Sequence, residues 1–83
     1  MTLLYFAWIR QKVGAAQEIM ELPPGIKTVR DLVDHLQNRG GGFLEAFGDT
    51  SRLRAAVNQQ HVNFDAAISE NDEVAFFPPV TGG

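Results

Sequence analysis

The sequence contains no cysteine among its 83 residues. This absence excludes disulfide bonds, thiolate metal sites and a cysteine nucleophile. Lysine and arginine total only seven and form no run, and the formal net charge is −3. Nucleic acids and anionic membrane surfaces both attract clustered positive charge, so neither partner is expected.

Long apolar runs are also missing. The most apolar stretch, residues 3–9, ends at Arg10 and is far too short to cross a bilayer. No basic segment precedes it, so it does not have the pattern of a signal peptide. The sequence therefore predicts a cytoplasmic protein, and its length fits one small domain with a thin core.

Few residues are suited to metal binding or nucleophilic catalysis. The two histidines, His35 and His61, lie far apart in the sequence, whereas a metal site needs three or four converging ligands. Two surface histidines are the simpler interpretation, and no metal site is expected. Ser51 and Ser69 fit turns better than they fit a catalytic triad.

The apolar pattern predicts strands before and after one main helix. Both alternating faces of residues 3–9 are apolar, which indicates a central strand rather than one covered on a single side. Residues 10–16 contain Gly14 and are expected to form the turn of an initial hairpin. The predicted strands cover residues 3–9, 17–22, 53–58, 61–64 and 73–77.

The main helix is predicted from its capping signals and its apolar stripe. Thr28 is a candidate N-cap and Asp31 follows three residues later, a variant of the capping box. Gly40 is expected to end the helix, the next two glycines to extend the break, and residues 43–48 to form one short helical turn. The stripe, at positions i, i+3, i+4 and i+7, consists of Val29, Leu32, Val33 and Leu36.

This order of elements predicts an α+β fold in which the helix lies across one face of a mixed sheet. Four to five strands with one main helix form the plan of the β-grasp fold. We expect a β-grasp domain over residues 1–77 and a flexible tail over residues 78–83.

The tail is the most unusual part of the chain. Its six residues are Pro78-Pro79-Val80-Thr81-Gly82-Gly83. The prolines stiffen the exit from the last strand, and glycines without a Cβ fit a narrow channel. Fully extended, six residues reach roughly 20 Å, enough to carry a carboxyl group into another protein. Composition alone leaves a frayed terminus or a cloning remnant as alternatives.

Residues 72–83, with the sequence DEVAFFPPVTGG, closely resemble the C-terminal signature of molybdopterin synthase small subunits, which are ubiquitin-like sulfur carriers. Residues 55–59 resemble the strand and turn before that signature. Residues 4–7, with Arg10 and Gly14, resemble the N-terminal strand and turn of the family. The resemblance runs through nearly the whole chain in the right order.

The resemblance implies that the carboxyl group of Gly83 is the reactive group. An E1-like activating enzyme would use ATP to convert it to an acyl-adenylate, and a sulfur donor would then displace AMP and leave a thiocarboxylate. A large subunit would bind the tail, threaded through Val80, Thr81 and Gly82, and the sulfur would pass to a pterin precursor to form the molybdopterin dithiolene. The chain would be the non-catalytic, cofactor-free subunit of a heterotetramer.

The first and last predicted strands are apolar on both faces, although one helix can cover only one face. Part of the second face is therefore expected to remain exposed as an interaction patch. The alternative, that loops and the short helical turn cover these side chains, is left open. The candidate partner contacts are Phe6, Trp8, Phe76, Phe77, Pro78 and Pro79.

Three other functions are considered. A sulfur carrier for thiamine thiazole synthesis would share the Gly-Gly end, but residues 76–79, FFPP, favour the molybdopterin branch. A ubiquitin-like modifier would join Gly83 to a lysine of a target protein through the same acyl-adenylate. A structural module would leave the tail inert.

Overall fold

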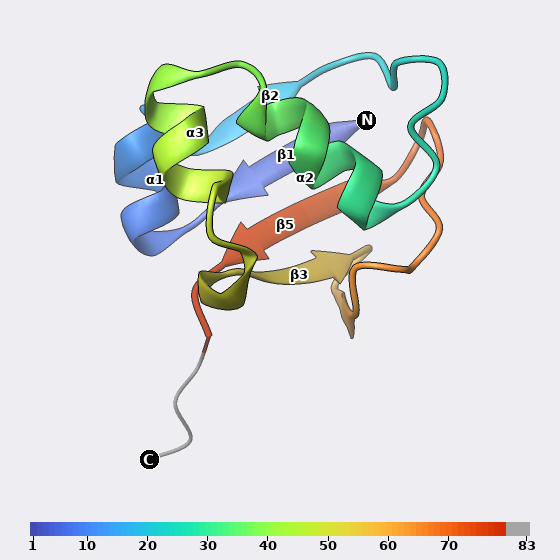
Figure 1. Cartoon of the computed structure of the whole chain (residues 1–83). Coiled ribbons are helices and arrows are strands. Elements are labelled where there is room, and N and C mark those ends of the chain that lie inside the picture. Colours follow the sequence, from blue (N-terminus) through green and yellow to red (C-terminus); the bar gives the residue numbers. More distant parts are fainter. Residues whose placement is uncertain (80–83) are drawn as a thin grey trace.

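The computed structural model describes residues 1–79, in which helices cover one face of a five-stranded sheet (Figure 1). The strand order is β2-β1-β5-β3-β4; β1 and β5 are parallel and the other neighbours are antiparallel. This is the predicted mixed sheet of an α+β β-grasp fold. Within the described part of the chain, no helix is long and apolar enough to span a bilayer.

Nine elements make up this arrangement of residues 1–79. The strands are β1 (Thr2–Tyr5), β2 (Gln17–Ile19), β3 (Arg54–Val57), β4 (Gln60–Val62) and β5 (Glu73–Phe77). The helices are α1 (Ala7–Val13), α2 (Val29–Gln37) and α3 (Gly41–Phe47), with the short 3-10 turn η1 (Thr50–Arg52). The final strand therefore has its predicted bounds, while β2, β3 and β4 are shorter than predicted.

Helix α2 begins with the capping box that the sequence predicts. The Thr28 hydroxyl accepts a hydrogen bond from the Asp31 amide at 3.2 Å, and the Asp31 carboxylate accepts from the Thr28 amide at 3.2 Å. A further bond from the Lys27 amide is the main reason that the pKa of Asp31 lies below its ordinary value. These bonds occupy amide groups that the first helical turn leaves free.

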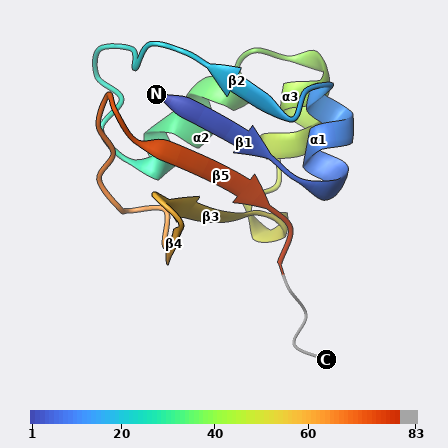
Figure 2. The same cartoon turned by 180° about the vertical axis from the view of Figure 1, so that it is seen from behind.

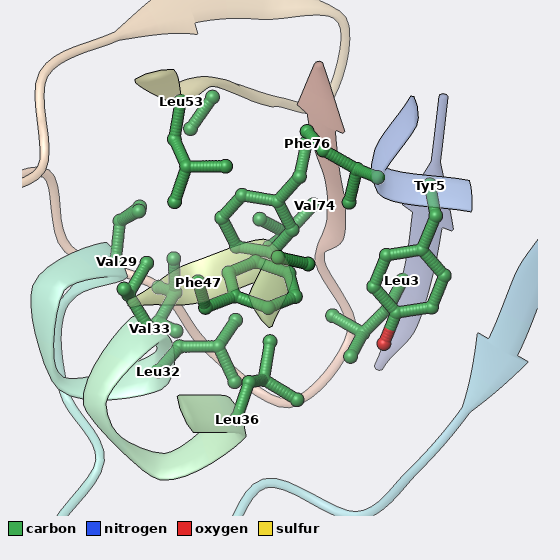
Figure 3. Close-up of a cluster of buried hydrophobic side chains, with 14 of the residues drawn as sticks. Leu3, Tyr5, Val29, Leu32, Val33, Leu36, Phe47, Leu53, Val74 and Phe76 are labelled. Carbon is green, nitrogen blue, oxygen red and sulfur yellow. The ribbon is translucent and has the colours of Figure 1, made fainter. Parts of the chain in front are cut away.

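The core lies between α2 and the sheet (Figure 3). Side chains of the predicted stripe on α2 are fully buried and face Leu3 of β1 and Val74 of β5. Phe47 of α3 meets Phe76 edge to face, with ring centroids 5.0 Å apart. Aromatic pairs in this geometry add to the stabilisation from burial.

The prediction of one strand over residues 3–9 is wrong. The first strand ends at Tyr5, Phe6 keeps an extended backbone, and Ala7 turns the chain into α1 with a positive φ of 54°. Helix formation buries Ile9 completely against the core. Helices this short are marginal alone, so this burial, rather than the strand propensity of the aromatic residues, decides the conformation.

The glycines after α2 also differ from the prediction. Helix α2 ends at Gln37, and Gly40 is the N-cap of α3 instead of the end of α2. Gly41 and Gly42 lie in the first turn of α3 rather than in an extended break. A Cβ at Gly42 would overlap the backbone carbonyl of Lys12 in α1, so this glycine permits close packing of the two helices.

The hairpin between β3 and β4 turns one residue earlier than predicted. Asn58 and Gln59 form its loop with positive φ values of 51° and 71°. Two-residue hairpin loops favour such angles because their twist matches that of the flanking strands. The Asn58 side chain also accepts from the Glu73 amide at 3.0 Å, which ties the loop to the start of β5.

A polar network joins β1 and β2 to the connection between α2 and α3. The Tyr5 hydroxyl donates to Glu18 at 2.9 Å, and Arg39 donates to both oxygens of Glu18 at 2.9 Å. Burial, followed by the bond to Glu18, raises the pKa of Tyr5 far above its ordinary value. Burial would raise the pKa of Glu18 too, but the bonds from Arg39 and Tyr5 outweigh it and hold this pKa below its ordinary value.

The packing of α1 on α3 predicts that Gly42→Ala destabilises the fold by about 1–3 kcal/mol, the usual cost of overpacking. The new methyl group would have to push Lys12 and its helix away. Urea unfolding measures the effect. Glu45→Ala, at an exposed site on the same helix, should change stability by less than about 1 kcal/mol, and equal effects of the two substitutions would contradict this account.

The network around Glu18 predicts that part of the folding stability is lost in acid. Because its folded-state pKa is lowered, its stabilisation is present above the ordinary pKa of 4.5 and is lost as pH falls through the folded-state value. Glu18→Gln should cost about 1 kcal/mol near neutral pH and progressively less in acid, measured by urea unfolding across the pH range. Exposed Glu21→Gln is the control. A Glu18→Gln deficit that stays constant with pH would refute the assignment.

Candidate functional site

The sheet face opposite α2 is uncovered by helices in the described residues (Figure 2). We call it the open face. Strand pairing places Leu4 of β1 beside Ala75 of β5, and Ala75 beside Ala56 of β3. Ala56 in turn lies opposite His61 of β4. A row of three apolar side chains that ends at His61 therefore crosses the sheet on the side away from the core.

A shallow depression of about 450 Å³ occupies this face. Apart from its one imidazole, its lining is apolar. Such a surface is poor at binding ions or polar metabolites, and it suits contact with an apolar protein surface. The lining residues are Phe6, Ala56, His61, Ala75 and Phe77.

Phe6 is held at the rim of the depression by the end of β1. Its amide donates to the Phe76 carbonyl at 3.1 Å, which continues the pairing of β1 with β5 by one residue. The turn at Ala7 then leads the chain away into α1. The Phe6 side chain remains 48% exposed, so it is one of the few large apolar side chains that the described residues present to solvent.

Phe77 lies where the sheet ends and the tail begins. It is half-buried, and its ring centroid is 5.0 Å from that of His61. Pro78 and Pro79 follow it and are also half-buried. The predicted threading residues Val80, Thr81 and Gly82 and the predicted reactive residue Gly83 lie outside the described residues.

Two of the predicted partner contacts do not belong to the open face. Phe76 is fully buried, with its side chain in the core beside Phe47, so it offers no surface to a partner (Figure 3). Trp8 lies on α1 rather than on a strand, is half-buried against the core, and stacks under the Arg52 guanidinium at 4.5 Å. It does not line the depression.

A second and larger depression, of about 540 Å³, lies between the start of α2, η1 and the hairpin of β3 and β4. Two arginines line it, but each already has a partner. Arg30 pairs with Asp65 at 3.2 Å, and Arg54 donates to the Leu53 carbonyl at 2.8 Å. Across residues 1–79, no three His, Asp or Glu side chains gather as metal ligands.

Sequence reasoning missed three of the residues that line the depression: Ala56, Ala75 and His61. Alternation along β5 could have indicated Ala75, because it lies between the apolar residues of one face. Ala56 and His61 could not be placed without the register between strands, which short strands leave poorly determined in the sequence.

Solved structures show that the fold belongs to the ubiquitin-like class. A protein of Pyrococcus furiosus, provisionally named molybdopterin converting factor, subunit 1, superimposes with a TM-score of 0.74 at 34% identity. The match covers 95% of each chain. The sheet that carries the open face therefore belongs to a known architecture.

The chain belongs to the ThiS family, whose profile matches residues 3–83. It is 42% identical to the molybdopterin synthase sulfur carrier subunit of Escherichia coli, over 98% of this chain and 96% of that protein. It is 32% identical to the protein of the same name from Haemophilus influenzae, over 100% and 99% of the two chains. The family resemblance of the tail and the N-terminal strand is thereby confirmed.

Proposed function

We propose that this chain is the sulfur carrier subunit of a molybdopterin synthase and that it acts through the carboxyl group of Gly83. The observation that carries the proposal is near full-length similarity to proteins of that name. The open face supports it, because a carrier needs a surface on which a partner can dock. The composition also fits, since a chain without cysteine cannot carry sulfur as its own persulfide.

The proposed chemistry begins with a poor electrophile. A carboxylate resists attack because its charge is delocalised and oxide is a poor leaving group. An E1-like enzyme would join the Gly83 carboxylate to the AMP portion of ATP and release pyrophosphate. The outer sulfur of a persulfide donor would then attack the acyl carbon and expel AMP. A second thiol would cleave the resulting acyl disulfide and form a disulfide with the rest of the donor, so that the terminal group becomes a thiocarboxylate. The nucleotide would bind to the activating enzyme, and this chain would hold no cofactor.

In the second half of the cycle, the large subunit would take the loaded tail into its pocket. The thiocarboxylate sulfur would attack the pterin precursor, and water would hydrolyse the acyl–sulfur bond so formed, which leaves the sulfur on the pterin and a carboxylate on Gly83. The six residues after Phe77, if extended, would span roughly 20 Å. This reach lets the body of the carrier stay outside the pocket while its terminal group enters it.

The described residues explain how the body could present that tail. The final strand β5 lies between β1 and β3 and pairs with both along its length. The chain therefore leaves the sheet from its interior rather than from a fraying edge. Because Phe77 and Phe6 flank the exit, a partner that receives the tail would cover the open face as well.

Intact-mass analysis of the protein from its native host tests the reactive group. We expect a fraction of molecules heavier by one oxygen-to-sulfur exchange, located at Gly83. Deleting Gly83 should abolish this fraction and molybdenum-cofactor synthesis, while the free energy of unfolding in urea stays within about 0.5 kcal/mol of wild type because the core of the described residues ends at Phe76. Conjugates to other proteins would support a modifier instead. Retained cofactor synthesis without Gly83 would exclude the proposal.

Phe6→Asp tests the docking surface. Removing a phenyl ring and burying a charge should weaken binding to the large subunit by about tenfold or more, measured by calorimetry. Aspartate is a good N-cap, so α1 should still form. Leu44→Asp is the matched control, because Leu44 is 51% exposed but lies on α3, away from the open face. Equal affinities for the two variants would contradict docking through this face.

A further inference from the structure

His61 occupies an unusual position for an ionisable side chain. It extends from the short edge strand β4 onto the open face, opposite Ala56, and its imidazole packs against the Phe77 ring at 5.0 Å with an interplanar angle of 48°. Of the five residues that line the depression, all within the described chain, His61 alone carries a titratable group. The side chain is exposed in the free subunit, so water can solvate either of its protonation states.

A partner that covers the open face would change the relative stability of the charged and neutral forms of this imidazole. A partner that fills the depression removes water from the imidazole and replaces it with apolar contacts. Burial without a counter-charge disfavours the charged form of a histidine. Histidine is also the side chain that ordinarily changes charge between about pH 5 and 8, so the effect falls in an accessible range.

The neighbouring strands offer no compensating carboxylate at this point. On β3, the charged residue nearest in register is Arg54, which lines the other depression and donates to the Leu53 carbonyl. On β5, Glu73 lies two residues from Ala75, toward Asn58 and the far end of the strand. Phe6, the lining residue beyond β5, carries no charge. Within residues 1–79, the imidazolium would therefore gain no ion pair from this chain on docking.

We infer that the large subunit docks only on the form of the open face in which His61 is neutral, so that this residue makes assembly pH-dependent. The inference rests on the proposed function, because it takes the large subunit as the occupant. It also specifies the partner: the surface opposite His61 is apolar and carries no carboxylate. A carboxylate there would give the opposite pH dependence, with tighter binding in acid.

Calorimetric titration of the large subunit from the same organism with this chain tests the inference at about pH 5.5 and about pH 7.5. Histidines in general lose most of their charge across this interval, so wild-type binding should be up to about tenfold weaker at the lower pH. His61→Gln, which is polar but does not titrate, should remove most of this difference. His61→Leu should remove it as well and bind at least as tightly as wild type at the higher pH.

His35→Gln is the matched control, because His35 is the other histidine and lies half-buried near the end of α2. It should keep the wild-type pH dependence, and thermal unfolding at both pH values verifies that every variant is folded. Equal affinity of wild type at the two pH values, tighter binding in acid, or an unchanged pH dependence in His61→Gln would overturn the inference and leave the proposed function standing. Absence of binding at either pH would overturn both.

Discussion

Successive side chains of a β-strand point to opposite faces of a sheet, and β5 uses both faces. Val74 and Phe76 enter the core beneath α2, where they are fully buried. Ala75 and Phe77 lie between them in sequence and point to the open face. One strand thus anchors the fold and builds the candidate docking surface. A one-residue slip of β5 would exchange the two sets, so the core packing of Phe76 fixes the position of Phe77.

The short helix α1 extends this arrangement to the other side of the exit. Because the chain turns into a helix at Ala7, Phe6 directly follows the end of β1 and stays at the rim of the depression. The helix is held by the burial of Ile9 and by its close approach to Gly42 of α3. Packing on the covered side of the molecule therefore determines which aromatic side chain remains on the open side.

The sequence was informative wherever local signals and burial agreed. The capping box at Thr28, the stripe of α2 and the strand β5 could be predicted because their patterns have a single good structural solution. Residues 7–13 could not, since aromatic and branched residues favour a strand locally and only tertiary packing makes a helix the better choice. The assignment of Phe76 to a partner surface failed for a related reason. In a strand that is apolar on both faces, composition does not say which face the core takes, and that choice depends on pairing with β1 and β3.

An exposed apolar face carries a risk of self-association, and the architecture limits it. Sheets aggregate most readily through long unpaired edges, yet both edge strands here, β2 and β4, have only three residues each. The strands that contribute most of the open face, β1, β5 and β3, are all paired on both sides. Ile19 is 76% exposed on β2, but Gln17 and Glu18 share that short strand and keep its edge polar. The net charge of −3 adds repulsion between copies. The described residues can therefore keep the apolar depression open to a partner while they offer another copy only short strand edges.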